Sequence, residues 1–295
     1  MRLASIRRNG TVSAVLVDGD EIVDLAIASP DLPQDVTSLL CPDDPTRTAL
    51  AEALASGIGR SSSSGVEFAP PIARPSKFLA VGLNYADHVA ESGLTTPEHP
   101  TIFAKMPSCI IGAHDDVVRP AVSTQLDYEG ELGIVIGRRC RHVTREDAPS
   151  VIGGYLTIND VSVRDYQLRD SQWTLGKSFD THGVLGPWIT TADAIDPHQL
   201  VVTTTVNGEV RQKSNTKHLI RDCFALVELL SSVCTLEPGD IIATGTPGGV
   251  GMARKPPLWL AAGDVVRIEI DGLGSTENLI VEERALNGDA EARTA

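Results

Sequence analysis

Apolar residues recur along this chain in short runs of strand length, and few stretches have helical spacing. Continuous or alternating apolar runs predict strands at residues 3–6, 12–17, 21–25, 78–82, 132–137, 151–158, 201–206, 240–244 and 265–270. Asn207-Gly208 separates two such runs and is the strongest hairpin signal. Helical spacing predicts helices only near 46–55 and 221–234. Many strands and few helices predict an α+β fold that is mainly β, in which a curled mixed sheet carries peripheral helices.

The first seventy residues form a unit of their own in this pattern. Their three predicted strands are joined at Asn9-Gly10 and Asp18-Gly19, which are good tight-turn dipeptides. A serine tract at 60–65 and a proline-rich stretch through Pro75 follow and indicate a flexible linker. The sequence therefore predicts a small β-rich amino-terminal domain with its linker at 1–70 and a catalytic domain at 71–295.

Charge narrows the range of partners. The 295 residues include 25 Lys and Arg against 39 Asp and Glu, which gives a formal net charge of −14. Nucleic acids and anionic membranes both require a cationic surface, so neither is an expected partner. The amino end lacks an apolar block of signal-peptide length, and we expect a cytoplasmic protein. Five dispersed cysteines without a CxxC spacing favour free thiols.

Two glutamates in the extended segment 126–137 suggest a metal site. Side chains alternate along a strand, so Glu129 and Glu131 share a face while Leu132 lies on the other. Two adjacent carboxylates on a buried strand repel each other unless a cation lies between them, and hard divalent ions prefer oxygen ligands. The alternative is a solvent-facing edge strand with two unpaired glutamates. Asp160 ends another apolar run, where an Asn-Asp pair is by itself ordinary turn chemistry.

Seven short segments occur in a family-specific order. They are Gly82-Leu-Asn-Tyr-Ala-Asp-His88, Tyr128-Glu-Gly-Glu-Leu132, Asn159-Asp160, Arg164-Asp-Tyr-Gln167, Gly176-Lys-Ser-Phe-Asp180, Asn207-Gly-Glu209 and Gly245-Thr-Pro-Gly-Gly-Val-Gly251. Together they resemble the fumarylacetoacetate hydrolase superfamily from about Lys77 to Val281. Within it, the chain looks most similar to the acylpyruvase and 2,4-dioxo-3-deoxy-sugar-acid hydrolase group.

The resemblance implies a fold, a metal and a reaction. The implied fold is a mixed β-sandwich roll, usually in a homodimer. The implied metal is Mg²⁺ or Mn²⁺, with Ca²⁺ as a further candidate, bound by Glu129, Glu131 and Asp160. The expected reaction is hydrolysis of a carbon–carbon bond in a 2,4-dioxo acid of the acylpyruvate type, through a metal-bound pyruvate enolate. Oxaloacetate decarboxylation and hydration or isomerisation of a 2-oxo-dienoate remain alternatives.

Further roles follow from matching the motifs. Lys177 is expected to stabilise the charge that develops on the enolate or to deliver a proton to it. His88 and Glu91 have i, i+3 spacing, so the carboxylate can orient the imidazole as a base for water; the alternative is an exposed pair without function.

The remaining motif residues are expected to bind substrate. Arg164 and Gln167 orient the substrate, although a purely structural ion pair for Arg164 is equally open. Gly245 and Thr246 hold its carboxylate. Some acylpyruvase relatives carry a basic residue where this chain has Leu83, so the far end of the substrate is expected to differ.

Overall fold

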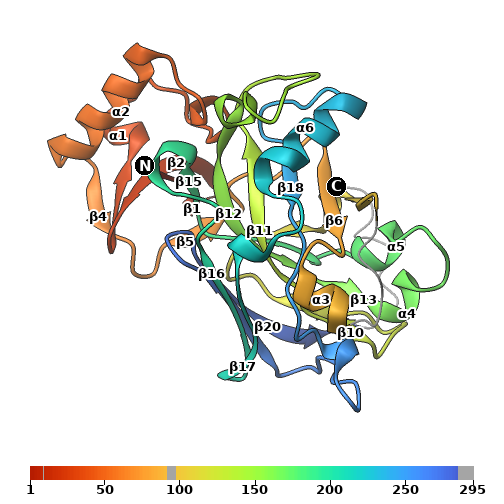
Figure 1. The fold of residues 1–295 in the computed structure, drawn as a ribbon. Helices are drawn as coiled ribbons and strands as arrows, with labels where there is room; N and C mark the ends of the chain where they lie inside the picture. Colours follow the sequence, from red (N-terminus) through yellow and green to blue (C-terminus); the bar gives the residue numbers. More distant parts are fainter. Residues whose placement is uncertain (9, 92–97, 285–295) are drawn as a thin grey trace, which may run out of the picture.

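Strands dominate the computed structural model, which describes residues 1–8, 10–91 and 98–284. The largest sheet has 13 strands, and its main path runs β4-β3-β2-β1-β15-β12-β11-β18-β6-β7 (Figure 1). Its strands are β1 (Arg2–Arg8), β2 (Thr11–Asp18), β3 (Glu21–Asp24), β4 (Arg60–Ser62), β5 (Glu67–Ala69), β6 (Phe78–Gly82), β7 (Thr101–Lys105), β8 (Ile110–Ile111), β11 (Gly130–Ile136), β12 (Ile152–Asp160), β14 (Gly183–Leu185), β15 (Ile189–Thr191) and β18 (Ile241–Ala243).

Two smaller sheets contain the other strands of the described residues. A five-stranded sheet has the order β17-β16-β19-β20-β9, and β10 pairs with β13. Their strands are β9 (Val117–Arg119), β10 (Leu126–Asp127), β13 (Ser162–Val163), β16 (Val201–Val206), β17 (Glu209–Asn215), β19 (Val265–Ile270) and β20 (Gly274–Glu282).

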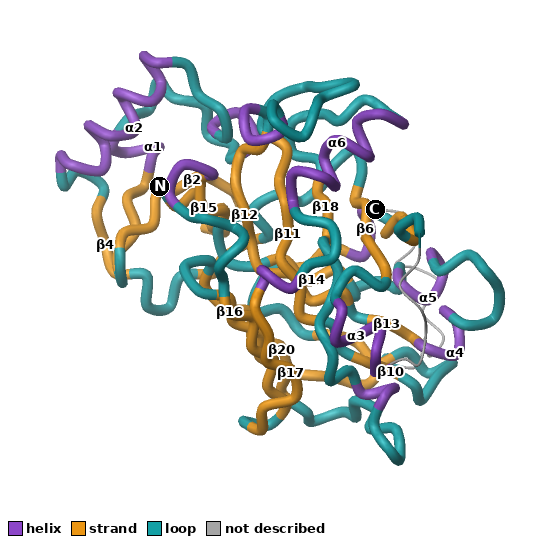
Figure 2. Tube along the Cα trace, in the orientation of Figure 1, coloured by secondary structure: helices purple, strands orange, loops and turns teal. Residues whose placement is uncertain are grey.

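Helices are few and lie around the strands, as Figure 2 shows. They are α1 (Leu25–Ala28), α2 (Asp44–Ser56), α3 (Ala86–Glu91), α4 (Arg164–Gln167), α5 (Thr174–Lys177) and α6 (Cys223–Val233), with 3-10 turns at Thr37–Leu39, Pro107–Cys109, Ala148–Ser150, Ala192–Ala194, Thr216–His218 and Gly251–Ala253. The Asp222 carboxylate accepts a hydrogen bond from the Ala225 amide and caps α6, as expected at a helix start. The predicted mainly β, α+β fold is confirmed.

The sequence pattern located several strands to the residue. The predictions 78–82, 201–206 and 265–270 coincide with β6, β16 and β19. The flexible tract predicted at 60–65 is wrong in its first half, because Arg60–Ser62 forms β4 and pairs with β3. Arg60 anchors this strand through Asp18 at 2.9 Å and Glu21 at 2.8 Å. Local composition cannot predict these ion pairs, because the paired residues are far apart in the sequence.

The amino-terminal strands join the large sheet. β1 pairs antiparallel with β15, where Leu3 lies opposite Ile189. One apolar core contains Leu3 and Leu50 together with Leu156 from β12. Figure 1 shows this unit, in red and orange, at the β4 end of the sheet, with α3, α4 and α5 on the far side of the molecule. The domain boundary near residue 70 stays a prediction.

Candidate active site

Three buried carboxylates meet where β11 begins and β12 ends. The two strands are antiparallel, with Gly130 opposite Asn159. The Asp160 amide donates to the Glu129 carbonyl at 2.9 Å, which places Asp160 beside the two glutamates. Carboxylate oxygens of Glu129, Glu131 and Asp160 lie within 4.8 Å of one another. The exposed fractions of the three residues are 5%, 2% and 0%, so a solvent-facing edge strand is excluded.

Three buried cations surround these carboxylates. The Lys177 ammonium donates to Glu129 at 2.6 Å and to Asp160 at 2.7 Å. The Lys105 ammonium donates to the other Asp160 oxygen at 2.6 Å. Arg164 pairs with the second Glu129 oxygen at 2.6 Å and with a fourth buried carboxylate, Asp127, at 2.8 Å. Among the described residues of this cluster, four carboxylates thus face three cations.

Burial and neighbouring charges shift the pKa values of Glu131 and Lys177. Burial, reinforced by Asp160 and Glu129, raises the pKa of Glu131 well above its usual range. Burial alone would lower the pKa of Lys177, but the neighbouring carboxylates Asp160 and Glu129 outweigh it and raise that pKa. Lys177 therefore stays a cation, which suits the stabilisation of negative charge rather than the removal of a proton.

The donor set fits a hard divalent ion. Oxygen ligands at about 2.1 Å from Mg²⁺ lie at most about 4.2 Å from each other, so small side-chain movements bring the three carboxylates into one coordination sphere. The excess of one carboxylate over the cations supplies the negative charge that such an ion would balance. Glu129, Glu131 and Asp160 are the residues that would hold it.

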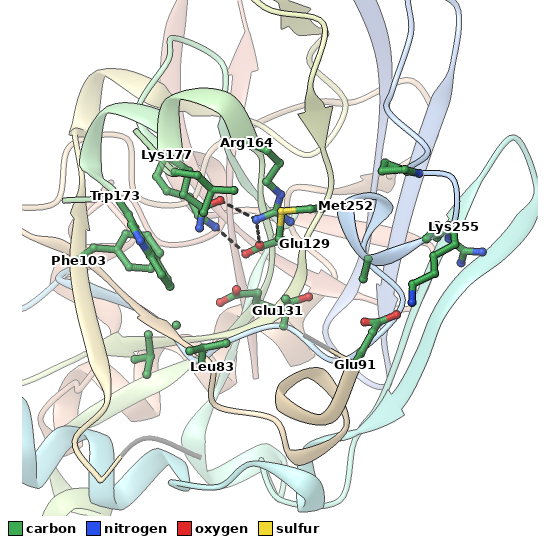
Figure 3. A pocket seen from close by; sticks show the side chains of 18 residues that line it. Leu83, Glu91, Phe103, Glu129, Glu131, Arg164, Trp173, Lys177, Met252 and Lys255 are labelled. Carbon is green, nitrogen blue, oxygen red and sulfur yellow. Dashed lines mark hydrogen bonds and ion pairs between the residues drawn. The ribbon is translucent and has the colours of Figure 1, made fainter. Parts of the chain in front are cut away.

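A cavity of about 650 Å³ opens over the carboxylates. Figure 3 shows Phe103 and Trp173 on one side of it and Glu91 and Lys255 on the other. It is lined by Val81, Gly82, Leu83, Glu91, Phe103, Glu129, Glu131, Arg164, Gln167, Leu168, Trp173, Lys177, Thr246, Met252, Ala253, Arg254, Lys255 and Pro257. Its size is typical of sites for small molecules.

The bend after β6 brings the chain close to the cavity wall. A Cβ on Gly82 would lie 2.3 Å from the Trp173 ring, so only glycine allows this approach. The next residue, Leu83, has a φ of 58°, a left-handed conformation that side chains with a Cβ rarely adopt. Backbone strain of this kind concentrates at ligand sites.

Three of the four predicted substrate-binding residues, Arg164, Gln167 and Thr246, line the cavity, whereas Gly245 is not among its lining residues. The Gly245 amide donates to Glu131 at 2.7 Å and so positions a carboxylate that could hold a metal ion. The Thr246 hydroxyl donates to the Gly130 carbonyl at 3.1 Å. Arg164 donates to the Gln167 side chain at 2.8 Å, which adds a structural contact to its place on the cavity wall. Their roles toward substrate stay predictions.

Helix α3 carries the predicted His–Glu pair. The Asn84 side chain holds the start of this segment by donating to the carbonyls of Arg221 at 2.9 Å and Thr244 at 2.8 Å. Glu91 lines the cavity and accepts a hydrogen bond from the Gly249 amide at 2.8 Å. The backbone of His88 lies in α3, but its side chain falls outside the described part of the structure.

Several residues of the site were missed by sequence reasoning. Lys105 alternates with Phe103 on the buried face of β7, and a lysine that continues an apolar face was the available signal. Asp127 accepts hydrogen bonds from Arg164 and from the amides of Gly251 and Met252, at 2.8, 2.8 and 3.0 Å. Its position two residues before Glu129 gave no such indication, because its partners are distant in sequence.

Gln212 is a further missed residue. It is buried, accepts from the Gly130 amide at 3.0 Å and the Thr204 hydroxyl at 2.8 Å, and donates to Thr246 at 2.8 Å and the Pro247 carbonyl at 2.9 Å. It thereby joins the backbone between the two glutamates to the loop that follows β18.

Two further observations concern the cysteines and the helices. All five cysteines are free. No helix within residues 1–8, 10–91 and 98–284 is both long and apolar enough to cross a membrane.

Comparison with known proteins gives a family match over the part of the chain that contains the site. Residues 77–281 match the family described as fumarylacetoacetate (FAA) hydrolase C-terminal. The mitochondrial oxaloacetate tautomerase Fahd2a of Rattus norvegicus is 42% identical over 265 residues, covering 89% of this chain and 85% of the rat protein.

Two solved structures have the same fold. The fumarylacetoacetate hydrolase of Exiguobacterium antarcticum superposes with a TM-score of 0.85 at 35% identity, over 96% of this chain and 100% of the other. The maleylpyruvate hydrolase of Sphingobium sp. SYK-6, in complex with manganese(II) and pyruvate, gives a TM-score of 0.81 at 35% identity over the same shares.

Proposed function

Because the chain belongs to the fumarylacetoacetate hydrolase family, we propose that it is a divalent-metal-dependent enzyme that interconverts the keto and enol forms of a 2-oxo acid such as oxaloacetate. The observation that carries this proposal is the buried cluster of Glu129, Glu131 and Asp160, in which Lys177 pairs with Glu129 and Asp160. The 42% identity to an oxaloacetate tautomerase supports this outcome over the hydrolysis that the sequence favoured.

The chain's own residues supply the charge stabilisation. When bound, a divalent ion would act as a Lewis acid toward the 2-oxo carbonyl. The Lys177 ammonium has three N–H groups. Two of them donate to Glu129 and Asp160, so the third can donate to a substrate oxygen. Water exclusion strengthens this interaction, because Lys177 is buried beside the Phe103 ring, whose centroid lies 5.1 Å away.

Proton exchange at the carbon next to the carbonyl needs a base. Glu91 lies on the cavity wall with its carboxylate oriented by the Gly249 amide. We assign proton transfer to Glu91 together with His88, as their spacing on α3 predicts.

Hydrolytic cleavage of a 2,4-dioxo acid is the second candidate. It shares the enolate with tautomerisation and adds only a water, activated by His88 and Glu91, that attacks the second carbonyl. The 35% identity to a maleylpyruvate hydrolase over 96% of the chain favours it specifically. Oxaloacetate decarboxylation and dienoate isomerisation remain within the same chemistry.

A substrate panel tests these outcomes. Oxaloacetate, acetylpyruvate and fumarylpyruvate are each followed by enol absorbance and by pyruvate release, with Mg²⁺ or Mn²⁺ and with chelator. Tautomerase activity predicts metal-dependent equilibration of enol-oxaloacetate without pyruvate. Pyruvate release from a 2,4-dioxo acid would instead establish the hydrolase, and no metal-dependent change with any compound would contradict both.

The proposal also covers the identity of the bound metal ion and the oligomeric state of the protein. We propose Mg²⁺ or Mn²⁺ as the bound ion, since three carboxylates form an oxygen-only ligand set. We also propose a homodimer, for which light scattering of the purified protein is the direct measurement.

A further inference from the structure

The cavity carries a second group of cations on its far side. Arg254 and Lys255 line it together with Met252 and Pro257, on the loop that follows Gly251. Figure 3 shows Lys255 across the cavity from Phe103 and Trp173, with Met252 between Lys255 and the carboxylates. The cavity therefore has an aromatic side and a cationic side.

The three cations nearest the proposed metal ligands already form ion pairs with buried carboxylates. Lys105, Lys177 and Arg164 each pair with at least one buried carboxylate at 2.6–2.8 Å. A divalent ion would leave that cluster with one excess positive charge, which matches the single carboxylate at the 2-oxo end of a substrate. A second carboxylate would find no uncommitted cation among these three.

Arg254 and Lys255 form no such ion pair with a carboxylate of the described residues. Within the described residues, no carboxylate oxygen lies within 4.0 Å of either side-chain charge. The Arg254 guanidinium donates to the Arg211 carbonyl at 3.0 Å, and its buried Nε finds no partner within the same part of the chain. Arg254 lines the cavity, so its guanidinium can form a charge-assisted hydrogen bond with an anionic ligand there. Glu91 is the carboxylate on this side, and Lys255 extends toward it in Figure 3.

The loop is tied to the catalytic cluster. Asp127 accepts from the amides of Gly251 at 2.8 Å and Met252 at 3.0 Å while pairing with Arg164. The Leu258 amide closes the loop on the Gly251 carbonyl at 2.9 Å. Arg254 is thus presented at a fixed position relative to the carboxylates, as a specificity residue requires.

We propose that Arg254, assisted by Lys255, forms a subsite for a second carboxylate, so that the preferred substrates are 2-oxo diacids rather than acylpyruvates with an apolar tail. This inference rests on the proposed function only in placing the 2-oxo end at Glu129, Glu131 and Asp160. Met252 and Pro257 contact the carbon chain between the two ends.

Binding of matched ligands tests the subsite without catalysis. Calorimetry on the Mn²⁺-loaded protein compares 2-oxoglutarate with 2-oxopentanoate and 2-oxoadipate with 2-oxohexanoate, pairs that differ in the far carboxylate. At least one diacid should bind about tenfold or more tightly than its partner, since a hydrogen-bonded ion pair contributes about 1.5–3 kcal/mol. Arg254→Gln should remove that preference, and Arg254→Lys should keep part of it.

Controls separate this claim from folding and from the proposed reaction. Oxalate, which has no far end, should bind Arg254→Gln and wild type equally, and the exposed Arg267→Gln should retain the diacid preference. Equal binding of diacids and monoacids by wild type, or an equal loss of both in Arg254→Gln, would overturn the subsite. Failure of the enzyme to turn over any 2-oxo acid would contradict the proposed function and leave this comparison intact.

Discussion

The hydrogen-bond network of Gln212 predicts a measurable loss of both stability and metal affinity. Gln212→Met keeps the length of an unbranched side chain but removes all four hydrogen bonds. The Gly130 amide and the Pro247 carbonyl, both buried, then lose their Gln212 partner. A buried polar group left without a partner costs about 1–3 kcal/mol, so the free energy of unfolding should fall by about 2–6 kcal/mol.

The same substitution should loosen the metal site, because Gly130 lies between Glu129 and Glu131. Residues that orient metal ligands typically change affinity by about 10–100-fold when mutated. Urea unfolding of the metal-free protein and Mn²⁺ titration measure the two effects. Gln34→Met, which removes one hydrogen bond to the Leu32 carbonyl, should cost less than about 1 kcal/mol. A Gln212→Met protein that matches wild type in unfolding free energy and in Mn²⁺ affinity would refute the reasoning.

Three further predictions concern single residues. Lys177→Met should lower kcat/KM at least about 100-fold without weakening Mn²⁺ binding, whereas Lys217→Met on the surface should change neither. Burial lowers the pKa of His182 to about 3 from an unfolded value of 6.5, so the neutral ring stabilises the fold above pH 6.5 and this stabilisation is lost as pH falls toward 3. Unfolding free energies of His182→Gln should therefore decline less between pH 7 and 4 than those of wild type, and parallel curves would contradict this. His88→Ala should abolish turnover with saturating Mg²⁺ while Mn²⁺ affinity is retained, and unchanged turnover would remove His88 from the mechanism.

The sequence predicted those parts of the molecule that depend on neighbouring residues. Strand alternation placed Glu129 and Glu131 on one face, and the structure shows both at the same site. The order of the motifs added Asp160, Lys177 and Arg164, all of which meet in the buried cluster.

What could not be predicted depends on contacts between distant segments. Lys105 reaches Asp160 across 55 positions, and Gln212 reaches Gly130 across 82. The serine tract became strand β4 because Arg60 pairs with Asp18 and Glu21, 42 and 39 positions away. Local pattern carries no information on such pairs, since they arise only when the sheets assemble.

The order of the sheet was open for the same reason. Pairing of β1 with β15 joins residues 2 and 190, so the amino-terminal strands extend the large sheet although their sequence resembles a separate unit. Register between such distant strands is fixed by burial of both faces in the assembled core.

Titration of Mn²⁺ into wild type and Glu131→Gln, followed by the spectroscopic signal of the free ion, tests the central claim most directly. Glutamine can still accept the hydrogen bond from Gly245, so only the ligand charge is lost. The metal site predicts that Glu131→Gln weakens Mn²⁺ binding at least about 100-fold and abolishes turnover, while the exposed Glu52→Gln changes neither. Mn²⁺ affinity and turnover in Glu131→Gln equal to those of wild type would contradict the account.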